Sequence, residues 1–179
     1  MNVDLYEKIW MWGVGVVLAA FFATTAISAV TGAVHPPSHV ETIDPTKVLA
    51  DPRFRRQGIS TDESGRLHAW VVGLTFAWLP AEMTVPTDTP ITFHITSTDV
   101  THGFQIIRTN GQSMVVPGYV SQFTTRFDEP GEYVVVCNEY CGLGHHTMAG
   151  RLHVVPLAQW QAPSAGAAVN TAGATHASH

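Results

Sequence analysis

The first long hydrophobic segment of the chain runs from Ile9 to Val34 and contains no charged residue. A helix needs roughly 20 apolar residues to cross the hydrocarbon core of a bilayer, and this segment exceeds that length. Trp10 and Trp12 lie at one end of it, where tryptophan suits the membrane interface. The pattern therefore predicts a membrane-spanning helix over residues 9–34, preceded by an N-terminal foot over residues 1–8.

A cleaved signal peptide is the alternative interpretation of this segment, with residues 26–29 as the small-residue cleavage site. Two features oppose it. The apolar run is longer than the roughly 7–15 residues of a signal core, and Asp4, Glu7 and Lys8 form a poor positive leader. We therefore expect an uncleaved anchor. Because basic residues flank both ends, the positive-inside rule decides little about its orientation.

Short β-rich runs separated by turn residues fill the later part of the chain. Ile91, Phe93 and Ile95 alternate with polar residues, as in a half-buried strand. A clear turn, Asp128-Glu129-Pro130-Gly131, separates two further runs. Several short strands at this spacing in about 90 residues predict a sandwich or barrel over residues 66–156. The strands that we expect are 67–75, 91–96, 120–127 and 132–136.

The regions on either side of this β domain differ from it in composition and in hydrophobic pattern. Residues 35–65 begin His35-Pro36-Pro37, contain mixed charges and show little periodicity, which predicts a linker running over a surface. After Pro156 the chain consists mostly of Ala, Gly, Ser, Thr and His. Such a composition cannot bury much apolar area, so residues 157–179 are expected to form a flexible tail.

Composition narrows the possible partners. The 179 residues carry a net charge of −5 and no run of lysine or arginine, so nucleic acid is not expected as a partner. Charged residues make up only 13% of the chain, which is low for a wholly soluble protein. Two cysteines, four positions apart, are the most informative residues.

A cluster of soft ligands follows an apolar strand near the end of the β domain: Cys137, Cys141, His145 and Met148. Thiolate, imidazole and thioether together favour copper. A mononuclear blue-copper site would use one cysteine, whereas two thiolates on one loop can bridge two copper ions. Each copper would then need one histidine, so a second histidine must come from elsewhere in the fold. His102, after the strand 91–96 and before Gly103, is the best distant candidate.

The cysteines and histidines also allow other interpretations. The cysteines could form a disulfide or could hold zinc with His102 and His145, although zinc gains nothing from a methionine. His146 competes with His145, and spacing alone does not separate them. His94 and His153 alternate along strands and are expected to be surface or packing residues.

At these residues the sequence resembles subunit II of haem-copper terminal oxidases, the cytochrome c oxidase family. The resemblance covers residues 3–155 and is carried by Cys-x-x-x-Cys-x-x-x-His-x-x-Met with Asp-Val-x-His upstream. It implies a dinuclear copper (CuA) centre in which the two cysteines bridge both ions and each histidine binds one. The axial ligands would be Met148 and the backbone carbonyl of Glu139. The ligands it implies are His102, Cys137, Glu139, Cys141, His145 and Met148.

The resemblance also implies a mainly β, cupredoxin-like Greek-key sandwich, preceded by one transmembrane helix and facing the bacterial or archaeal periplasm. Most members of the family have two such helices. A single helix resembles the ba-type branch, in which a small separate single-helix subunit takes the missing place. In that branch a glutamate corresponding to Glu7 lies at the entrance of a proton pathway into subunit I; from sequence alone it is an ordinary interfacial charge.

Four further residues have more than one interpretation. Phe76 and Trp78 occupy the place of an aromatic segment that receives electrons from the donor, or they are plain core residues. Asp99 orients the His102 loop, meets subunit I or caps a turn. In the two-helix branch a carboxylate at the position of Glu139 helps to hold magnesium at the interface with subunit I, whereas the single-helix branch often lacks it.

The function expected is therefore the electron-input subunit of a proton-translocating oxidase. Its donor would be cytochrome c or a small copper protein, and its acceptor would be haem in subunit I, which also carries CuB. The chain has no Cys-x-x-Cys-His for a haem of its own. The alternatives are a membrane-anchored stand-alone copper carrier or chaperone, and the CuA subunit of a nitric-oxide reductase. A nitrous-oxide reductase would need several hundred more residues.

Overall fold

The computed structural model describes residues 4–30 and 41–161, which fall into two compact units divided between residues 39 and 40. Some of the predicted segments lie partly outside the described residues. These parts are residues 1–3 of the foot, 31–34 of the anchor, 35–40 of the linker and 162–179 of the tail.

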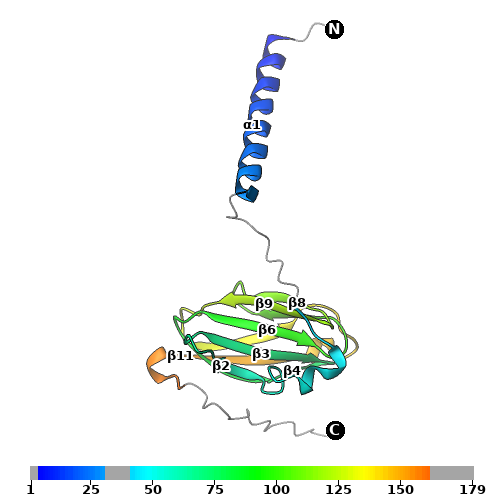
Figure 1. Cartoon of the computed structure of the whole chain (residues 1–179), viewed down its shortest axis with the longest axis vertical. Helices are drawn as coiled ribbons and strands as arrows, with labels where there is room; N and C mark the ends of the chain where they lie inside the picture. Colours follow the sequence, from blue (N-terminus) through cyan, green and yellow to red (C-terminus); the bar gives the residue numbers. More distant parts are fainter. Residues whose placement is uncertain (1–3, 31–40, 162–179) are drawn as a thin grey trace. The chain divides into compact units, whose positions relative to one another are not determined.

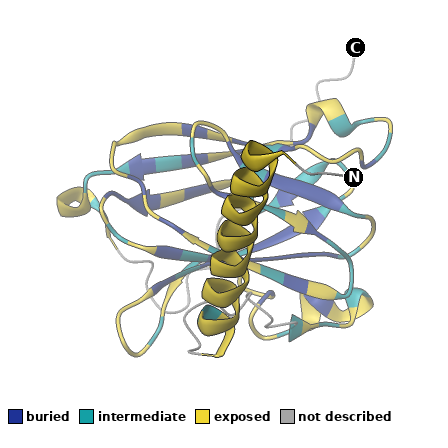
Figure 2. Cartoon of the chain, turned by 90° about the horizontal axis from the view of Figure 1, so that it is seen from above, coloured by how far each residue is buried: buried dark blue, intermediate teal, exposed yellow. Residues whose placement is uncertain are grey.

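The first unit contains one α-helix, α1, over Leu5–Val30. It is long and apolar enough to cross a membrane, and none of its residues is buried within the chain. Figure 2 shows this exposure along its whole length. Exposed apolar side chains all round a helix are stable in lipid rather than in water, which agrees with the predicted membrane span.

The second unit is a sandwich of two β-sheets (Figure 1). One sheet has the order β1-β9-β6-β3-β2, with β4 paired to β3, and the other has the order β5-β11-β10-β7-β8. The strands are β1 (Glu41–Thr42), β2 (Gly58–Thr61), β3 (Leu67–Leu74), β4 (Ala77–Leu79), β5 (Glu82–Pro86), β6 (Ile91–Ser97), β7 (His102–Ile106), β8 (Gln112–Val115), β9 (Tyr119–Thr125), β10 (Gly131–Cys137) and β11 (Ala149–Val155). Three short 3-10 helices complete it: η1 (Pro45–Ala50), η2 (His145–Thr147) and η3 (Leu157–Gln159).

Alternation along the strands builds the core between the sheets. On β6, Ile91, Phe93 and Ile95 are buried, as their spacing predicts, and on β10 Tyr133, Val135 and Cys137 face the same interior. Among the consecutive strands β6 to β9, β6 pairs with β9 and β7 with β8, which is a Greek-key arrangement. The expected cupredoxin-like Greek-key sandwich after one apolar helix is thereby confirmed.

The sandwich begins earlier in the chain than residue 66. In the region expected to be a linker, β1 pairs with β9 and β2 pairs with β3. Phe54 is fully buried and packs edge-to-face on Trp70, with ring centroids 5.2 Å apart. Together with Val48, Val72 and Val120 it forms a second apolar cluster. The structure thus places residues 41–65 in the domain, because their few apolar side chains cover a face of the first sheet.

Candidate metal centre

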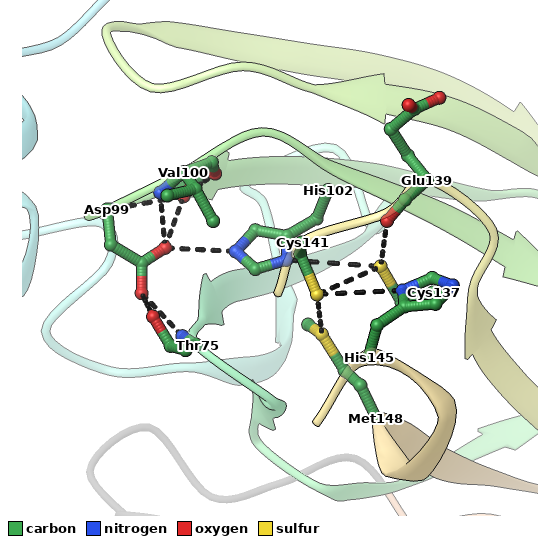
Figure 3. Close-up of polar contacts among 10 residues, drawn as sticks. Thr75, Asp99, Val100, His102, Cys137, Glu139, Cys141, His145 and Met148 are labelled. Atoms are coloured by element: carbon green, nitrogen blue, oxygen red, sulfur yellow. Dashed lines mark hydrogen bonds and ion pairs between the residues drawn. The ribbon is translucent and has the colours of Figure 1, made fainter. Parts of the chain in front are cut away.

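Three segments of the second unit bring the predicted ligands together (Figure 3). His102 begins β7, Cys137 ends β10, and the loop that follows β10 carries Cys141 and then η2. Strands β7 and β10 are paired, with Cys137 opposite Phe104, so His102 and Cys137 lie at the same end of one sheet. The amide of Cys137 donates to the carbonyl of Met148 over 3.2 Å, which closes the loop on itself.

The side-chain atoms of the predicted ligands lie close enough together to bind a metal. The two cysteine sulfurs are 3.8 Å apart. The Sγ of Cys137 lies 3.9 Å from His102 Nδ1, and the Sγ of Cys141 lies 3.6 Å from His145 Nδ1. Each sulfur therefore has one imidazole beside it. His146 is exposed, so of the two adjacent histidines the structure turns His145 towards the sulfurs.

Two weaker donors complete the set. The Sδ of Met148 lies 3.7 Å from Cys141 Sγ, and the backbone carbonyl of Glu139 lies 3.1 Å from Cys137 Sγ. Figure 3 shows the carboxylate of Glu139 pointing away from the sulfurs, so only its carbonyl faces the centre. Met148 is buried to 2% exposure. One weak donor thus stands beside each cysteine.

The donor set fits a soft or borderline metal such as copper. Ligand atoms of His102, Cys137 and Cys141 all lie within 4.8 Å of one another, and all three residues are buried. A sulfur separation of 3.8 Å is far beyond the roughly 2.05 Å of a covalent disulfide, and both cysteines are free. Two thiols, two imidazoles and a thioether are the ligands that copper prefers.

The electrostatics of the sulfurs also favour a cation. Burial, followed by the hydrogen bond and the charge of Cys137, raises the pKa of the Cys141 thiol. Two thiols this close resist joint ionisation because two negative charges would be buried together. A bound cation would remove that resistance, since metal ligation requires the thiolate.

A carboxylate outside the ligand set orients His102. Asp99 Oδ1 lies 2.9 Å from His102 Nε2, and the other oxygen accepts hydrogen bonds from the amide and hydroxyl of Thr75. Burial acts to raise the pKa of Asp99, but hydrogen bonds from Thr75, His102 and Val100 outweigh it and lower the pKa to about 2. Asp99 is therefore ionised at neutral pH and holds the proton on Nε2, which leaves Nδ1 free to bind a metal.

Gly103 lets the cysteine segment approach the histidine strand closely. A Cβ on Gly103 would lie 1.8 Å from Asn138 Oδ1 and 2.9 Å from the amide of Glu139. The amide of Asn138 donates to the carbonyl of Gly103 over 2.9 Å. A side chain at this position would push the two segments apart, as the sequence predicted for the glycine after His102.

The predicted aromatic residues border the centre in different ways. Trp78 is buried and packs edge-on against His102, with ring centroids 5.8 Å apart. Phe76 is half-buried in the turn between β3 and β4, next to the loop of Cys141. Glu7 lies in the first turn of α1, in the other unit, and stays a prediction.

Sequence reasoning missed one residue that supports the site. Thr75, which fixes Asp99, carries no recognisable signal in the sequence. His94, expected to be a surface or packing residue, is a buried packing residue: it stacks on Trp70 and its Nε2 lies 2.9 Å from His68 Nδ1. His153 is half-buried and lies 3.7 Å from Glu82.

Comparison with known proteins agrees with this geometry. Residues 74–155 match the family model of the cytochrome c oxidase subunit II periplasmic domain. The chain is 38% identical over 159 residues to a cytochrome c oxidase subunit 2 of Thermus thermophilus, covering 83% of this chain and 91% of that protein. It is 39% identical over 129 residues to another Thermus thermophilus subunit 2, covering 69% of this chain and 93% of that protein.

A solved structure is also similar over most of the chain. It is one chain of a haem-copper terminal oxidase dimer determined by cryo-electron microscopy, with a TM-score of 0.55 and 27% sequence identity. The likeness covers 81% of this chain and 99% of that one. It therefore extends beyond the matched domain of residues 74–155.

Proposed function

The chain belongs to the cytochrome c oxidase subunit II family, and we propose that it is the subunit through which electrons enter a haem-copper terminal oxidase. One observation carries this proposal. Two buried thiols, 3.8 Å apart, each have an imidazole nitrogen within 3.9 Å and a weak donor within 3.7 Å. A structural zinc site or a single-cysteine copper site would leave part of this set unused.

We assign the ligands of a dinuclear copper centre accordingly. Cys137 and Cys141 would bridge two coppers, His102 and His145 would each bind one, and Met148 and the carbonyl of Glu139 would be axial. When bound, the copper pair would supply one-electron uptake and release between the donor and the haem of subunit I. The protein's part is to hold these donors in place, and all six come from one sheet end and from a loop closed by backbone hydrogen bonds.

The burial of the ligands and the hydrogen bonds that hold them support this role. His102, Cys137, Cys141 and Met148 are all buried, so water has little access to the ligand atoms. Asp99 fixes the His102 ring through Nε2, and its other oxygen is held by Thr75. A ligand set that is already assembled needs little rearrangement when its charge changes, which favours fast electron transfer.

We place the protein in a bacterial or archaeal cell membrane as a single-pass subunit, with the copper domain on the outer, periplasmic face. Helix α1 has the length and composition of a membrane span, and the matched family model describes a periplasmic domain. We further propose that the domain begins at about residue 41, where β1 joins the sandwich, and ends near residue 160 rather than at residue 156, because Trp160 packs against the core and its Nε1 donates to the carbonyl of Thr84.

The partners follow from the same proposal. Subunit I, with its haem and CuB, would accept the electrons and carry out oxygen reduction and proton pumping, and a small single-helix subunit would stand beside α1. Cytochrome c or a small copper protein would be the donor. Because Trp78 is buried and Phe76 is half-buried, Phe76 is the aromatic side chain of the two that a donor could reach.

Two peripheral sites remain proposals. Glu7, in the exposed first turn of α1, would stand at the entrance of a proton pathway into subunit I. The carboxylate of Glu139 is exposed and points away from the sulfurs, so it is free to help hold magnesium at the interface with subunit I.

Electron paramagnetic resonance of the full chain, purified in detergent and loaded with copper, tests the centre. We expect hyperfine splitting from two equivalent copper nuclei, and replacement of Cys141 by Ser should abolish it. Splitting from a single nucleus, or a native spectrum in C141S, would refute the bridging assignment. Purification from its own membranes tests the assembly: a chain without a haem-containing partner would contradict the oxidase proposal.

A further inference from the structure

The turn between β3 and β4 holds a large residue in a rare backbone conformation. Leu74 pairs with Ala77, so Thr75 and Phe76 form a two-residue turn. Phe76 has φ +67°, in the left-handed region that bulky side chains seldom adopt. Such an outlier persists only where its surroundings hold it in place, and it often marks a functional site.

The ring of Phe76 lies across the backbone of the loop that carries Cys141 and His145. A Cβ on Gly144 would lie 2.7 Å from Cγ and Cδ2 of this ring, and a Cβ on Gly142 would lie 3.2 Å from its Cε1 and Cζ. Leu143 at the tip of this loop is 90% exposed, so it does not anchor the stretch between the buried Cys141 and Met148. The ring of Phe76 is the apolar surface that Gly142 and Gly144 meet in this stretch.

The same turn also reaches the ligands through its backbone. The amide of Phe76 donates to the sulfur of Cys141. The amide and hydroxyl of Thr75 both donate to Asp99, whose other oxygen lies 2.9 Å from His102 Nε2 (Figure 3). Two adjacent residues of one turn thus contact both ligand-bearing parts of the centre, which are far apart in the sequence.

We propose that Phe76 is a positioning residue for the copper centre: its ring and amide hold the Cys141–His145 loop in the geometry that binds metal, while Thr75 fixes the His102 side. This inference rests on the proposed function. It assigns to Phe76 a role distinct from receiving electrons, because the ring contacts the metal-binding loop of this chain itself. Without the ring, the loop is free to move away from Cys137.

Copper retention and the spectrum of the centre test this role. In the copper-loaded full chain, Phe76→Ala should release copper to a chelator at least about tenfold faster, as outer-shell changes commonly do, and should make the two coppers inequivalent by electron paramagnetic resonance. Phe76→Tyr, which keeps the ring, should restore both properties. Phe123→Ala is the control, since Phe123 is also half-buried and stacks on Phe93 with centroids 5.1 Å apart. It should lower thermal stability while leaving the spectrum and the release rate unchanged.

A double-mutant cycle with Gly144 isolates the contact itself. Gly144 has φ −90°, which alanine adopts without strain, so Gly144→Ala acts only through the Cβ that meets the ring. It should speed copper release in the native background and change it little in Phe76→Ala. Equal effects in both backgrounds, or a native release rate in Phe76→Ala, would overturn the proposal. Failure of the proposed function would show differently, as a native chain lacking the two-copper signal.

Discussion

The Nε2 atom of His102 lies 2.9 Å from Asp99 Oδ1, and the ring is completely buried. The imidazole therefore has one nitrogen committed to a carboxylate and the other facing Cys137 at 3.9 Å. A carboxylate behind a metal-binding histidine fixes its tautomer and raises the basicity of the ligand. Asp99 thus strengthens His102 as a metal ligand, although Asp99 itself does not contact the sulfurs.

Replacing Asp99 by Asn should weaken copper binding by about 10- to 100-fold, because the neutral amide no longer stabilises the Nε2 proton. Competition with a chelator, measured on the full chain, gives the change in affinity. Asp128→Asn is the matched control, since Asp128 is exposed and pairs with Arg126 at 2.9 Å. Equal copper affinities in the two variants would show that Asp99 only caps its turn.

Met148→Leu should keep both coppers and change the reduction potential. The thioether is a weak donor 3.7 Å from Cys141 Sγ, and leucine fills a similar buried volume without donating to the metal. We expect a higher potential by redox titration and a two-copper spectrum that persists. Met114→Leu, at an exposed position on β8, should change neither. Loss of one copper in M148L would mean that the thioether is a required ligand.

Much of the sandwich and of the ligand set could be predicted because their signals are local. The alternation of Ile91, Phe93 and Ile95 defines β6, and the four strands predicted from such runs agree with β3, β6, β9 and β10 to within two residues at each end. The ligands from Cys137 to Met148 lie within one loop. His102 is predicted as their partner because a strand end and a glycine accompany it.

The remaining features depend on contacts between distant segments. Phe54 stands among arginines, so its sequence neighbourhood resembles a linker, yet it is fully buried against Trp70. The pairing of His68 with His94 requires the parallel register of β3 and β6, which no single segment encodes. Phe76, in its left-handed turn, contacts Gly142 and Gly144, which lie more than 60 residues further along the chain.

Phe54→Ala tests whether residues 41–65 belong to the domain. Deleting a fully buried phenylalanine removes the ring contact with Trp70 and opens a cavity in the second cluster, so we expect a loss of about 3–5 kcal/mol in the free energy of unfolding. Chemical unfolding followed by tryptophan fluorescence measures it. Arg55→Ala, at an exposed neighbouring position, should change stability by less than about 0.5 kcal/mol. Similar small effects in both variants would mean that the packing of Phe54 contributes little to the stability of the domain.

His94 should make the metal-free domain sensitive to mild acid. Its ring is buried, stacked on Trp70 with centroids 4.2 Å apart, and its Nδ1 has no hydrogen-bond partner among the described residues. Burial, and then the proximity of His68, lower the pKa of His94 to about 4; Glu41 acts in the opposite direction and Arg53 in the same one. In the unfolded chain this pKa returns to about 6.5.

Because the unfolded state then binds more protons between these two values, the contribution of His94 is fully present above about pH 6.5 and is lost as the pH falls towards 4. The loss should reach about 1–3 kcal/mol, at 1.36 kcal/mol per unit of pKa difference. Urea unfolding at pH 7.5, 5.5 and 4.5 should show it, and His94→Gln should flatten the dependence over this range, whereas the exposed His146→Gln should not. An unchanged pH dependence in H94Q would mean that the acid sensitivity arises elsewhere, and that His94 tolerates a proton in its buried position.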